Sequence, residues 1–326
     1  GYLVGEENQG MKNMFTMMNA ARLVVGLQGI CGAQSAMAKA MDYANERLQM
    51  RSLSGPKTPD QPADPIIVHP DVRRLLLTQR AIVEGGRALI YYAGQIADKA
   101  NLGDGEEAVQ AGQLLDFLTP IIKGTLTELS FESANNAVQV FGGHGYVAEN
   151  GVEQYVRDLR ITTIYEGTTG IQGLDLLGRK ILQVQGVGLM HFLGELNVVA
   201  ADLKLSSSQA DLGSRLESLG TEWGELAMAI GGKAQANLEE VGAASVDFLM
   251  YSGYAVLATC WGQVALAAER TLAADPDADR VYLEGKLATA RFFFERLLPR
   301  SAAHKAAMES GADNLMNLDA QALSAC

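Results

Sequence analysis

The sequence has few aromatic residues and only 3 cysteines, at positions 31, 260 and 326. Aromatic residues make up 6% of the 326 residues, whereas Ala and Leu are abundant, which favours helix over strand. The cysteines stand singly, without the spacing of a disulfide framework or a metal site. Such usage is typical of a reducing compartment, so we expect a cytoplasmic protein without a metal centre.

Positive charge is scarce as well, because 26 lysines and arginines stand against 38 aspartates and glutamates, a formal net charge of −12. An acidic surface repels polyanions, which argues against nucleic-acid binding. The most apolar long run, residues 254–268, contains Gln263 and falls short of the ~18 apolar residues of a spanning helix, so we expect no membrane span. Residues 1–5 read like the middle of a protein, and we expect the chain to be a fragment or a processed product.

No segment alternates apolar and polar residues as a half-buried strand does. Apolar residues instead recur at three- and four-residue steps, the period of a helix buried on one face. Long helices are predicted at residues 9–48, from Pro70 onward, at 104–141 with a break near Thr119–Pro120, and at 170–184. A loop rich in proline separates the first two helices. The four helices indicate an antiparallel bundle over residues 1–186.

Glycines at positions 186 and 188 mark a boundary, and further helices are predicted beyond it, at residues 190–203, 209–231, 234–273 and 276–310. The predicted fold class is therefore all-α: a four-helix bundle at 1–186 followed by a second helical domain at 187–326. Phe292–Phe294 is interpreted as part of a core or an interface. The first helix carries Gly26, Gly29 and Gly32, each of which costs up to ~1 kcal/mol in a helix interior. Close packing against either another helix or a ligand would explain them.

Two segments have a composition unlike that of ordinary helix ends. Residues 139–146 are Gln-Val-Phe-Gly-Gly-His-Gly-Tyr, whose glycines let backbone N–H groups approach a phosphate or a carbonyl, although a helix C-cap explains them as well. Residues 165–172 are Tyr-Glu-Gly-Thr-Thr-Gly-Ile-Gln. Glu166 follows apolar residues and precedes a helix start, so it is either a partly desolvated base or a carboxylate that favours the helix dipole.

Together these segments resemble the acyl-CoA dehydrogenase family over residues 1–185. Its members show the pattern Gln-x-Phe-Gly-Gly-x-Gly, followed about twenty residues later by Arg-Asp, then Ile-Tyr-Glu-Gly-Thr and a downstream Ile-Gln. This chain has them at 139–145, 157–158, 164–168 and 171–172. The resemblance implies that FAD is the cofactor and that an acyl-CoA thioester is the substrate. A carboxylate removes its α-proton and the flavin accepts the β-hydrogen as hydride, leaving the trans-2-enoyl-CoA.

The resemblance also assigns roles to single residues. Glu166 matches the catalytic base, whereas Ala21, at the place that supplies the base in some relatives, cannot act as one. Positions that match contacts with FAD are Arg47, Gln139, Gly142, Gly143 and Thr168. Positions that match contacts with the substrate are Arg22, Gly167 and, displaced by one residue, Arg179. Each arginine also has a purely structural interpretation. Arg22 would pair two helices, and Arg47 would favour the dipole at the end of the first helix.

Some departures point to a distinct branch of the family. Met50 replaces an aromatic residue that contacts the flavin, and His69-Pro70 replaces a His-Gln pair. The roughly 140 residues after the catalytic segment, with Tyr282–Lys286 and Leu297–Arg300, look like the extra domain of larger bacterial members such as the 3-methylmercaptopropionyl-CoA dehydrogenases.

Three functions remain open at this stage. The resemblance favours an acyl-CoA dehydrogenase of fatty acid metabolism, with electron-transfer flavoprotein as its partner. The family's flavin contact between subunits implies a homo-oligomer, either a dimer or a tetramer. An acyl-CoA oxidase would use the same base, and a non-catalytic assembly module would need no carboxylate at Glu166.

Overall fold

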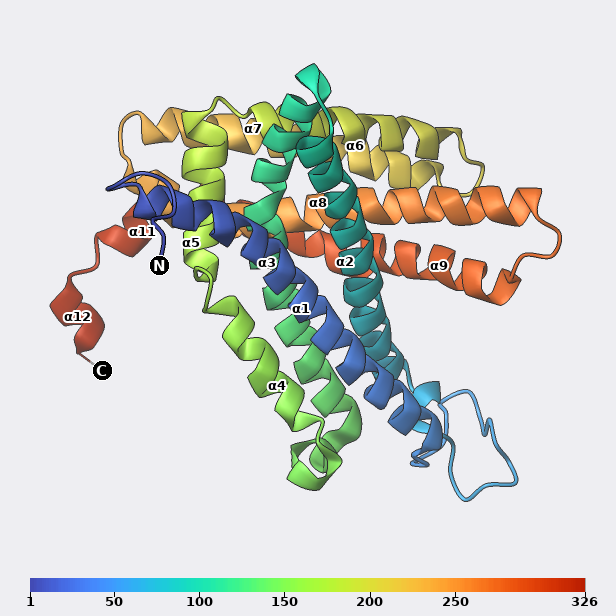
Figure 1. The fold of residues 1–326 in the computed structure, drawn as a ribbon. Helices are drawn as coiled ribbons and strands as arrows, with labels where there is room; N and C mark the ends of the chain where they lie inside the picture. The colour runs from blue at the N-terminus through green and yellow to red at the C-terminus, as the bar shows by residue number, and fades with distance from the viewer. Residues whose placement is uncertain (326) are drawn as a thin grey trace.

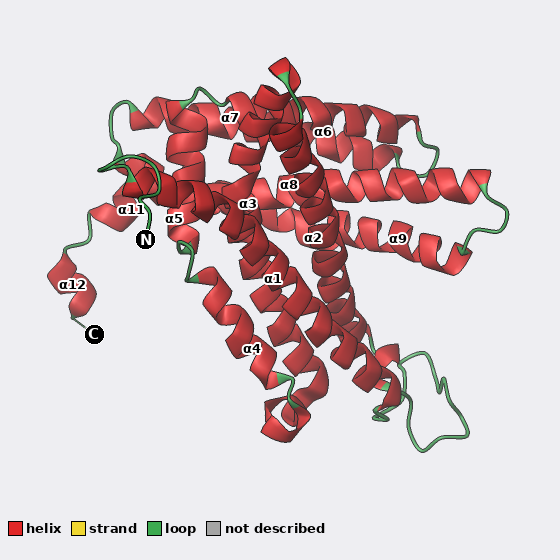
Figure 2. Cartoon of the chain, viewed as in Figure 1, coloured by secondary structure: helices red, strands yellow, loops and turns green. Residues whose placement is uncertain are grey.

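The computed structural model describes residues 1–325, which form helices joined by loops (Figures 1 and 2). Cys326, the last residue of the predicted second domain, lies outside the described residues. Within residues 1–325 the one extended pairing is an isolated bridge between Leu48 and Pro65. The predicted all-α fold class is confirmed.

Three long helices form the body of the bundle: α1 (Gly10–Glu46), α2 (Pro70–Leu102) and α3 (Gly105–Phe141). Each of the three packs against the other two, and α4 (Glu153–Arg160) lies against α1 and α3 (Figure 1). The predicted fourth helix consists of α5 (Thr169–Leu174) and wider π-helical turns at Asp175–Gln183. The turn before α5 carries Glu166.

The glycines of α1 serve helix packing. A Cβ on Gly26 would come within 2.6 Å of Ile122 Cγ2, and one on Gly32 within 2.6 Å of Leu159 Cδ2. Ile122 belongs to α3 and Leu159 to α4. Of the two explanations that the sequence left open, the structure thus supports close packing against other helices at these positions.

The predicted break near Thr119–Pro120 is wrong, because α3 continues through Pro120. An internal proline removes one helix hydrogen bond and costs about 3 kcal/mol in a free helix. Here both residues are buried between apolar neighbours, Leu118 and Ile121, which are 0% exposed. Tertiary packing therefore overrides the local preference to break.

The second half contains α6 (Val187–Leu205), α7 (Ala210–Ala234), α8 (Glu239–Ala274), α9 (Arg280–Phe292), α10 (Ser301–Glu309), α11 (Asp313–Met316) and α12 (Ala320–Ser324). The predicted helix at 276–310 is wrong in two respects. It begins at Arg280, where Asp279 accepts a hydrogen bond from the Tyr282 N–H, and Phe293–Arg300 interrupts it with π and 3-10 turns. Phe293 and Phe294 lie in the core, as expected.

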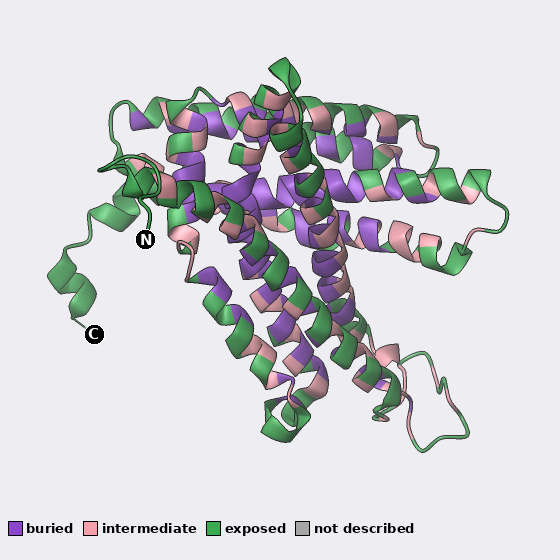
Figure 3. Ribbon diagram, in the orientation of Figure 1, coloured by how far each residue is buried: buried purple, intermediate pink, exposed green. Residues whose placement is uncertain are grey.

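The core is continuous between the two halves. The indole of Trp261 on α8 donates a 3.1 Å hydrogen bond to the carbonyl of Ala81 on α2, and one hydrophobic cluster includes residues of both halves. The middle of α8, residues 251–262, is buried throughout, whereas its two ends are partly exposed, and Figure 3 shows this change of burial along the helix. The division at residue 186 remains a prediction about domains, and the structure joins the two sides by direct packing.

Among residues 1–325, two helices, α1 and α8, are long and apolar enough to cross a membrane by length and composition alone, and a bent pair, Thr169–Gln183 with Val187–Leu205, would make a third if it were one span. In α8, 72% of the apolar window is buried inside the protein, whereas in α1 the share is 28%. The hydropathy of α8 is thus accounted for by internal packing. Exposed apolar side chains on α1 include Met11, Met17 and Val24. The expected absence of a membrane span remains a prediction.

The proline-rich loop is organised around Asp64, which is fully buried. Its carboxylate accepts hydrogen bonds from the N–H groups of Ser52, Lys57 and Thr58 at 2.8–2.9 Å, and from the Thr58 hydroxyl. Burial alone would raise the pKa of Asp64, but these donors hold it well below its usual value. The loop continues from Gln49 and Met50, which line a pocket described below.

We expect Asp64→Asn to open this loop, because an amide cannot accept all of these hydrogen bonds as a carboxylate does. Trypsin should then cut after Arg51 or Lys57 severalfold faster, with the helix content unchanged. Because the folded-state pKa is lowered, the contribution of Asp64 exists above its unfolded pKa of ~3.9 and is lost as the pH falls. Asp60→Asn, at an exposed position of the same loop, is the control; equal cleavage of both variants would contradict the assignment.

Candidate functional site

The turn that carries Glu166 lies between α4 and α5. Glu166 has φ +58° and Gly167 has φ +94°, so two successive residues adopt positive φ. This conformation is uncommon for a residue with a side chain and persists where the surroundings enforce it. Thr168 then caps α5, its hydroxyl accepting a bond from the Ile171 N–H at 3.4 Å. The chain therefore holds Glu166 in a defined and strained backbone position.

Three side chains hold the two carbonyl groups of this turn. The Glu166 carbonyl accepts hydrogen bonds from Arg22 Nε at 3.3 Å and Gln172 Nε2 at 3.2 Å. The Gly167 carbonyl accepts bonds from Gln172 Nε2 at 3.2 Å and Lys123 Nζ at 2.6 Å. The donors come from α1, α3 and α5. Three helices thus fix the two peptide groups that flank Gly167, Glu166–Gly167 and Gly167–Thr168.

Unlike the backbone carbonyl of Glu166, its carboxylate has an oxygen that accepts no hydrogen bond from the described residues. Its Oε2 is buried and has no hydrogen-bond partner among residues 1–325. A buried carboxylate oxygen without a donor is energetically unfavourable and is poised to accept a proton or a hydrogen bond from a group placed against it. The side chain can therefore serve as a general base.

Arg22 lies beneath this turn in a buried ion pair. Its Nη1 is 2.9 Å from Asp175 Oδ2, and the two side chains are 4% and 3% exposed. Arg179 Nε lies 2.8 Å from the other Asp175 oxygen, without the alignment of a hydrogen bond, and its side chain is 54% exposed. Both arginines were predicted to contact substrate. The structure places the Arg22 guanidinium against Asp175 and the Glu166 carbonyl, and leaves Arg179 at the surface.

A second group of predicted residues lines a pocket of about 710 Å³ at the other end of α1. Four of the five predicted cofactor contacts meet there: Arg47, Gln139, Gly142 and Gly143. Arg47 has no carboxylate partner among residues 1–325. A Cβ on Gly143 would meet nothing within 4 Å, so the backbone there borders open space. The pocket therefore offers a free guanidinium, an amide and accessible backbone.

The fifth predicted contact, Thr168, lies with Glu166 and outside this pocket. Along α1, 24 residues separate Arg22 from Glu46, which at 1.5 Å per residue is about 36 Å. The predicted site residues thus form two separate groups, one around Glu166 and one around Arg47.

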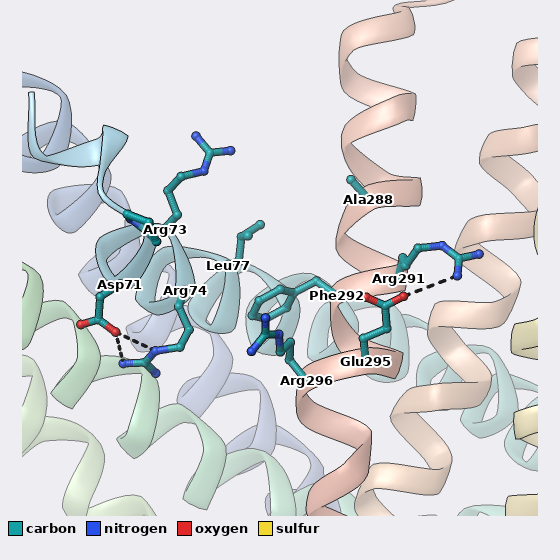
Figure 4. Close-up of a pocket in the computed structure, with 10 residues that line it drawn as sticks. Asp71, Arg73, Arg74, Leu77, Ala288, Arg291, Phe292, Glu295 and Arg296 are labelled. Carbon is teal, nitrogen blue, oxygen red and sulfur yellow. Dashed lines mark hydrogen bonds and ion pairs between the residues drawn. The ribbon is translucent and has the colours of Figure 1, made fainter. Parts of the chain in front are cut away.

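Another concave region lies between the start of α2 and α9 and has a volume of about 800 Å³. Figure 4 shows its walls, with Arg74 beside Asp71, Arg291 beside Glu295, and Phe292 and Leu77 between them. Arg73 and Arg296 also line it. None of the predicted site residues does, so it is distinct from both groups.

The sequence analysis missed three residues of the Glu166 group: Lys123, Gln172 as a carbonyl donor, and Asp175. Lys123 stands in the apolar run Leu118–Leu126 and is fully buried. Burial lowers its pKa to about 8, an effect that the carboxylates of Glu128 and Glu166 oppose. A lysine on an apolar helix face was the signal that could have identified it, since a charge is buried there only with partners.

Residues 8–182 match the family described as acyl-CoA dehydrogenase, C-terminal domain, and residues 192–319 match that described as acetyl-CoA dehydrogenase C-terminal like. The chain is 41% identical to 3-methylmercaptopropionyl-CoA dehydrogenase of Ruegeria pomeroyi, over 97% of this chain and 53% of that protein. It is 33% identical to the broad-specificity linear acyl-CoA dehydrogenase of Mycobacterium tuberculosis, over 98% and 54%. The chain thus spans about half the length of the curated relatives it matches.

Among solved structures, an acyl-CoA dehydrogenase from Bacillus anthracis complexed with FAD superposes with a TM-score of 0.73. The match covers 94% of this chain and 51% of that one, at 19% sequence identity. At this identity the likeness supports the fold alone.

Proposed function

The chain belongs to the acyl-CoA dehydrogenase family, in the branch with an extra C-terminal helical domain, and we propose that it carries the catalytic base of an FAD-dependent acyl-CoA dehydrogenase. The base is Glu166. The observation that carries this proposal is the combination of a clamped backbone and a buried, unpartnered carboxylate oxygen. The remaining half of the enzyme completes the substrate and flavin sites.

Glu166 takes the α-proton of the acyl-CoA thioester. FAD, when bound, supplies the acceptor for the β-hydrogen, and the product is the enoyl-CoA. A general base must lie within hydrogen-bond reach of the proton it removes, and a fixed approach lowers the entropy cost of the step. Arg22, Gln172 and Lys123 provide this fixation through the carbonyl groups, which leaves the carboxylate free for the substrate.

We propose that FAD contacts both groups of residues, and that the contacts belong to different flavins. Thr168 would lie near the diphosphate of the flavin that serves Glu166. Arg47, Gln139, Gly142 and Gly143 would hold the adenine end of a flavin bound mainly by a neighbouring subunit. The separation of about 36 Å along α1 supports this division, and the free Arg47 guanidinium suits a phosphate or a polar ring edge.

We expect Gly143→Leu to lower the FAD content of the full-length enzyme while its melting temperature, measured without flavin, stays unchanged. The new side chain would enter the open pocket instead of the protein, since nothing lies within 4 Å of the Cβ position. Absorbance at the flavin band per protein monomer gives the measurement.

Gly145→Ala is the matched comparison for this prediction. A Cβ there would come within 2.4 Å of the Val138 carbonyl oxygen, so this variant should lose stability instead. Full FAD content in Gly143→Leu would mean that the pocket does not receive the cofactor.

The partners follow from the same proposal. We propose a homo-oligomer, at least a dimer, in the cytoplasm, with electron-transfer flavoprotein as the electron acceptor. Arg22, Gly167 and Arg179 are proposed to lie near the acyl-CoA, with Arg22 acting mainly through the Glu166 turn. Sedimentation of the full-length enzyme, alone and mixed with electron-transfer flavoprotein, tests the assembly.

Anaerobic mixing of the full-length flavoenzyme with a panel of acyl-CoAs tests the function. Bleaching of the flavin absorbance by at least one of them is the expected result, and its absence with all of them would refute the reaction. Oxygen consumption without an added acceptor would identify an acyl-CoA oxidase instead. An assembly module would show neither signal.

A further inference from the structure

Lys123 is the one lysine among the largest fully buried side chains of residues 1–325. It lies on α3, a helix whose neighbouring residues Ile122 and Leu126 are 0% exposed. Burying an ammonium group is unfavourable unless partners compensate for the lost water. The groups that the Lys123 nitrogen contacts must therefore compensate for its burial.

The nitrogen contacts the turn beside the proposed base. Lys123 Nζ donates a 2.6 Å hydrogen bond to the Gly167 carbonyl, the shortest of the four bonds that hold the two carbonyl groups of this turn. Charge-assisted hydrogen bonds of this length are about twice as strong as neutral ones. The lysine therefore contributes most directly to the orientation of the Gly167–Thr168 peptide, one residue beyond Glu166.

The charged groups that act on the ammonium come from α1, from α3 itself and from the Glu166 turn. Glu128 on α3 and Glu166 on the turn attract it, whereas Arg22 on α1 repels it. Asp175 offsets the charge of Arg22 through their ion pair. Glu128 in turn accepts a hydrogen bond from the Thr169 hydroxyl, which ties the same part of α3 to the start of α5.

We propose that Lys123 is a positioning residue for Glu166, which it orients by holding the carbonyl of the next residue, Gly167. This inference rests on the proposed function of Glu166. Lys123 does not touch the reacting atoms. Without it, the Gly167 carbonyl would keep only the bond from Gln172, and the positive φ values at Glu166 and Gly167 would lose their main support from α3.

The first experiment replaces Lys123 by methionine, which has a similar length but neither charge nor donor, in the full-length flavoenzyme. We expect flavin reduction by acyl-CoA to slow about 10- to 100-fold, with FAD content and the KM for acyl-CoA unchanged. A lysine that only stabilised the fold would not lower the rate at saturating acyl-CoA while FAD content and KM stay unchanged.

Lys286→Met is the matched control. Lys286 is 14% exposed, pairs with Glu84 at 3.0 Å and belongs to α9, away from the Glu166 turn. This variant should keep the wild-type rate. Equal rates in Lys123→Met and the wild-type enzyme would overturn the proposal.

A second measurement keeps the lysine in place and uses this chain itself. With ¹³C-labelled lysine, the Lys123 side-chain resonance, assigned by its loss in Lys123→Met, should titrate near its pKa of about 8. In Glu166→Gln the midpoint should fall, because the carboxylate that favours the charged lysine is gone. An unchanged midpoint would refute the electrostatic coupling.

The two proposals can fail separately. If no acyl-CoA reduces the wild-type flavin, the proposed dehydrogenase function is wrong. The role of Lys123 in that function is then wrong too, whatever the titration shows. If the wild-type flavin is reduced and Lys123→Met is reduced equally fast, only the positioning role is wrong.

Discussion

Glu166→Gln is expected to slow the reduction of the flavin by acyl-CoA by about 10²- to 10⁴-fold, the contribution typical of a general base. Glutamine has nearly the same shape as glutamate but cannot accept the α-proton. Stopped-flow absorbance of the full-length enzyme under anaerobic conditions measures the rate. The substrate that bleaches the wild-type flavin fastest gives the widest range for the comparison.

The structure predicts that this variant folds and retains FAD. The bonds from Arg22, Gln172 and Lys123 end on carbonyl oxygens of the backbone, so the substitution removes none of them. The Glu166 Oε2 has no partner to lose among residues 1–325. Loss of rate should therefore occur with an unchanged melting temperature, which separates loss of the base from loss of the site.

Glu149→Gln serves as the control for Glu166→Gln, because Glu149 is an exposed glutamate of the segment before α4. It should react at the wild-type rate. If Glu166→Gln also reacts at the wild-type rate, Glu166 is not the base, and the base must come from the part of the enzyme outside this chain.

The sequence predicted the helices well where one face is apolar and failed where packing decides. Apolar residues at three- and four-residue steps correctly predicted the helix that begins at Pro70. Gly142 correctly predicted that α3 ends at Phe141. Pro120 carried a strong local signal for a break, yet burial keeps the helix intact. The helix predicted from residue 276 begins at Arg280, because Asp275 accepts a hydrogen bond from the Asp277 N–H within a turn, whereas Asp279 accepts one from the Tyr282 N–H at the helix start.

For the site, local motifs were enough to nominate Glu166 and the glycines of residues 142–143, because those residues carry their signal in short segments. The supporting residues could not be found in this way. Lys123 and Gly167 are 44 residues apart, and Arg22 and Asp175 are 153 apart. Periodicity shows that Lys123 stands on a buried face, but it does not show what its nitrogen meets. The tertiary fold supplies this information.

Arg22 shows how a motif can suggest one role and the structure another. The resemblance assigns it to the substrate, whereas the structure buries it against Asp175 and the Glu166 carbonyl. The two roles predict different kinetics. A substrate contact changes KM, whereas a support of the Glu166 turn changes the rate of the proton-transfer step at saturating substrate.

Asp175→Asn is expected to lower the free energy of unfolding of this chain by about 3–5 kcal/mol, because it leaves the Arg22 charge buried without its counter-charge. Both side chains are at most 4% exposed, so water cannot replace the lost partner. Urea unfolding followed by circular dichroism measures the change. In the full-length enzyme, flavin reduction at saturating acyl-CoA should slow as Arg22 releases the Glu166 carbonyl, with KM little affected.

The matched control for Asp175→Asn is Asp202→Asn. Asp202 pairs with Arg270 at the same 2.9 Å distance, but the two side chains are 43% and 70% exposed. Exposed pairs contribute less than about 1 kcal/mol, so this variant should remain near wild-type stability with an unchanged rate. Equal stability losses in the two variants would show that burial does not distinguish the pairs. If Asp175→Asn raised KM and left the rate unchanged, Arg22 would be a substrate contact instead of a support of the Glu166 turn.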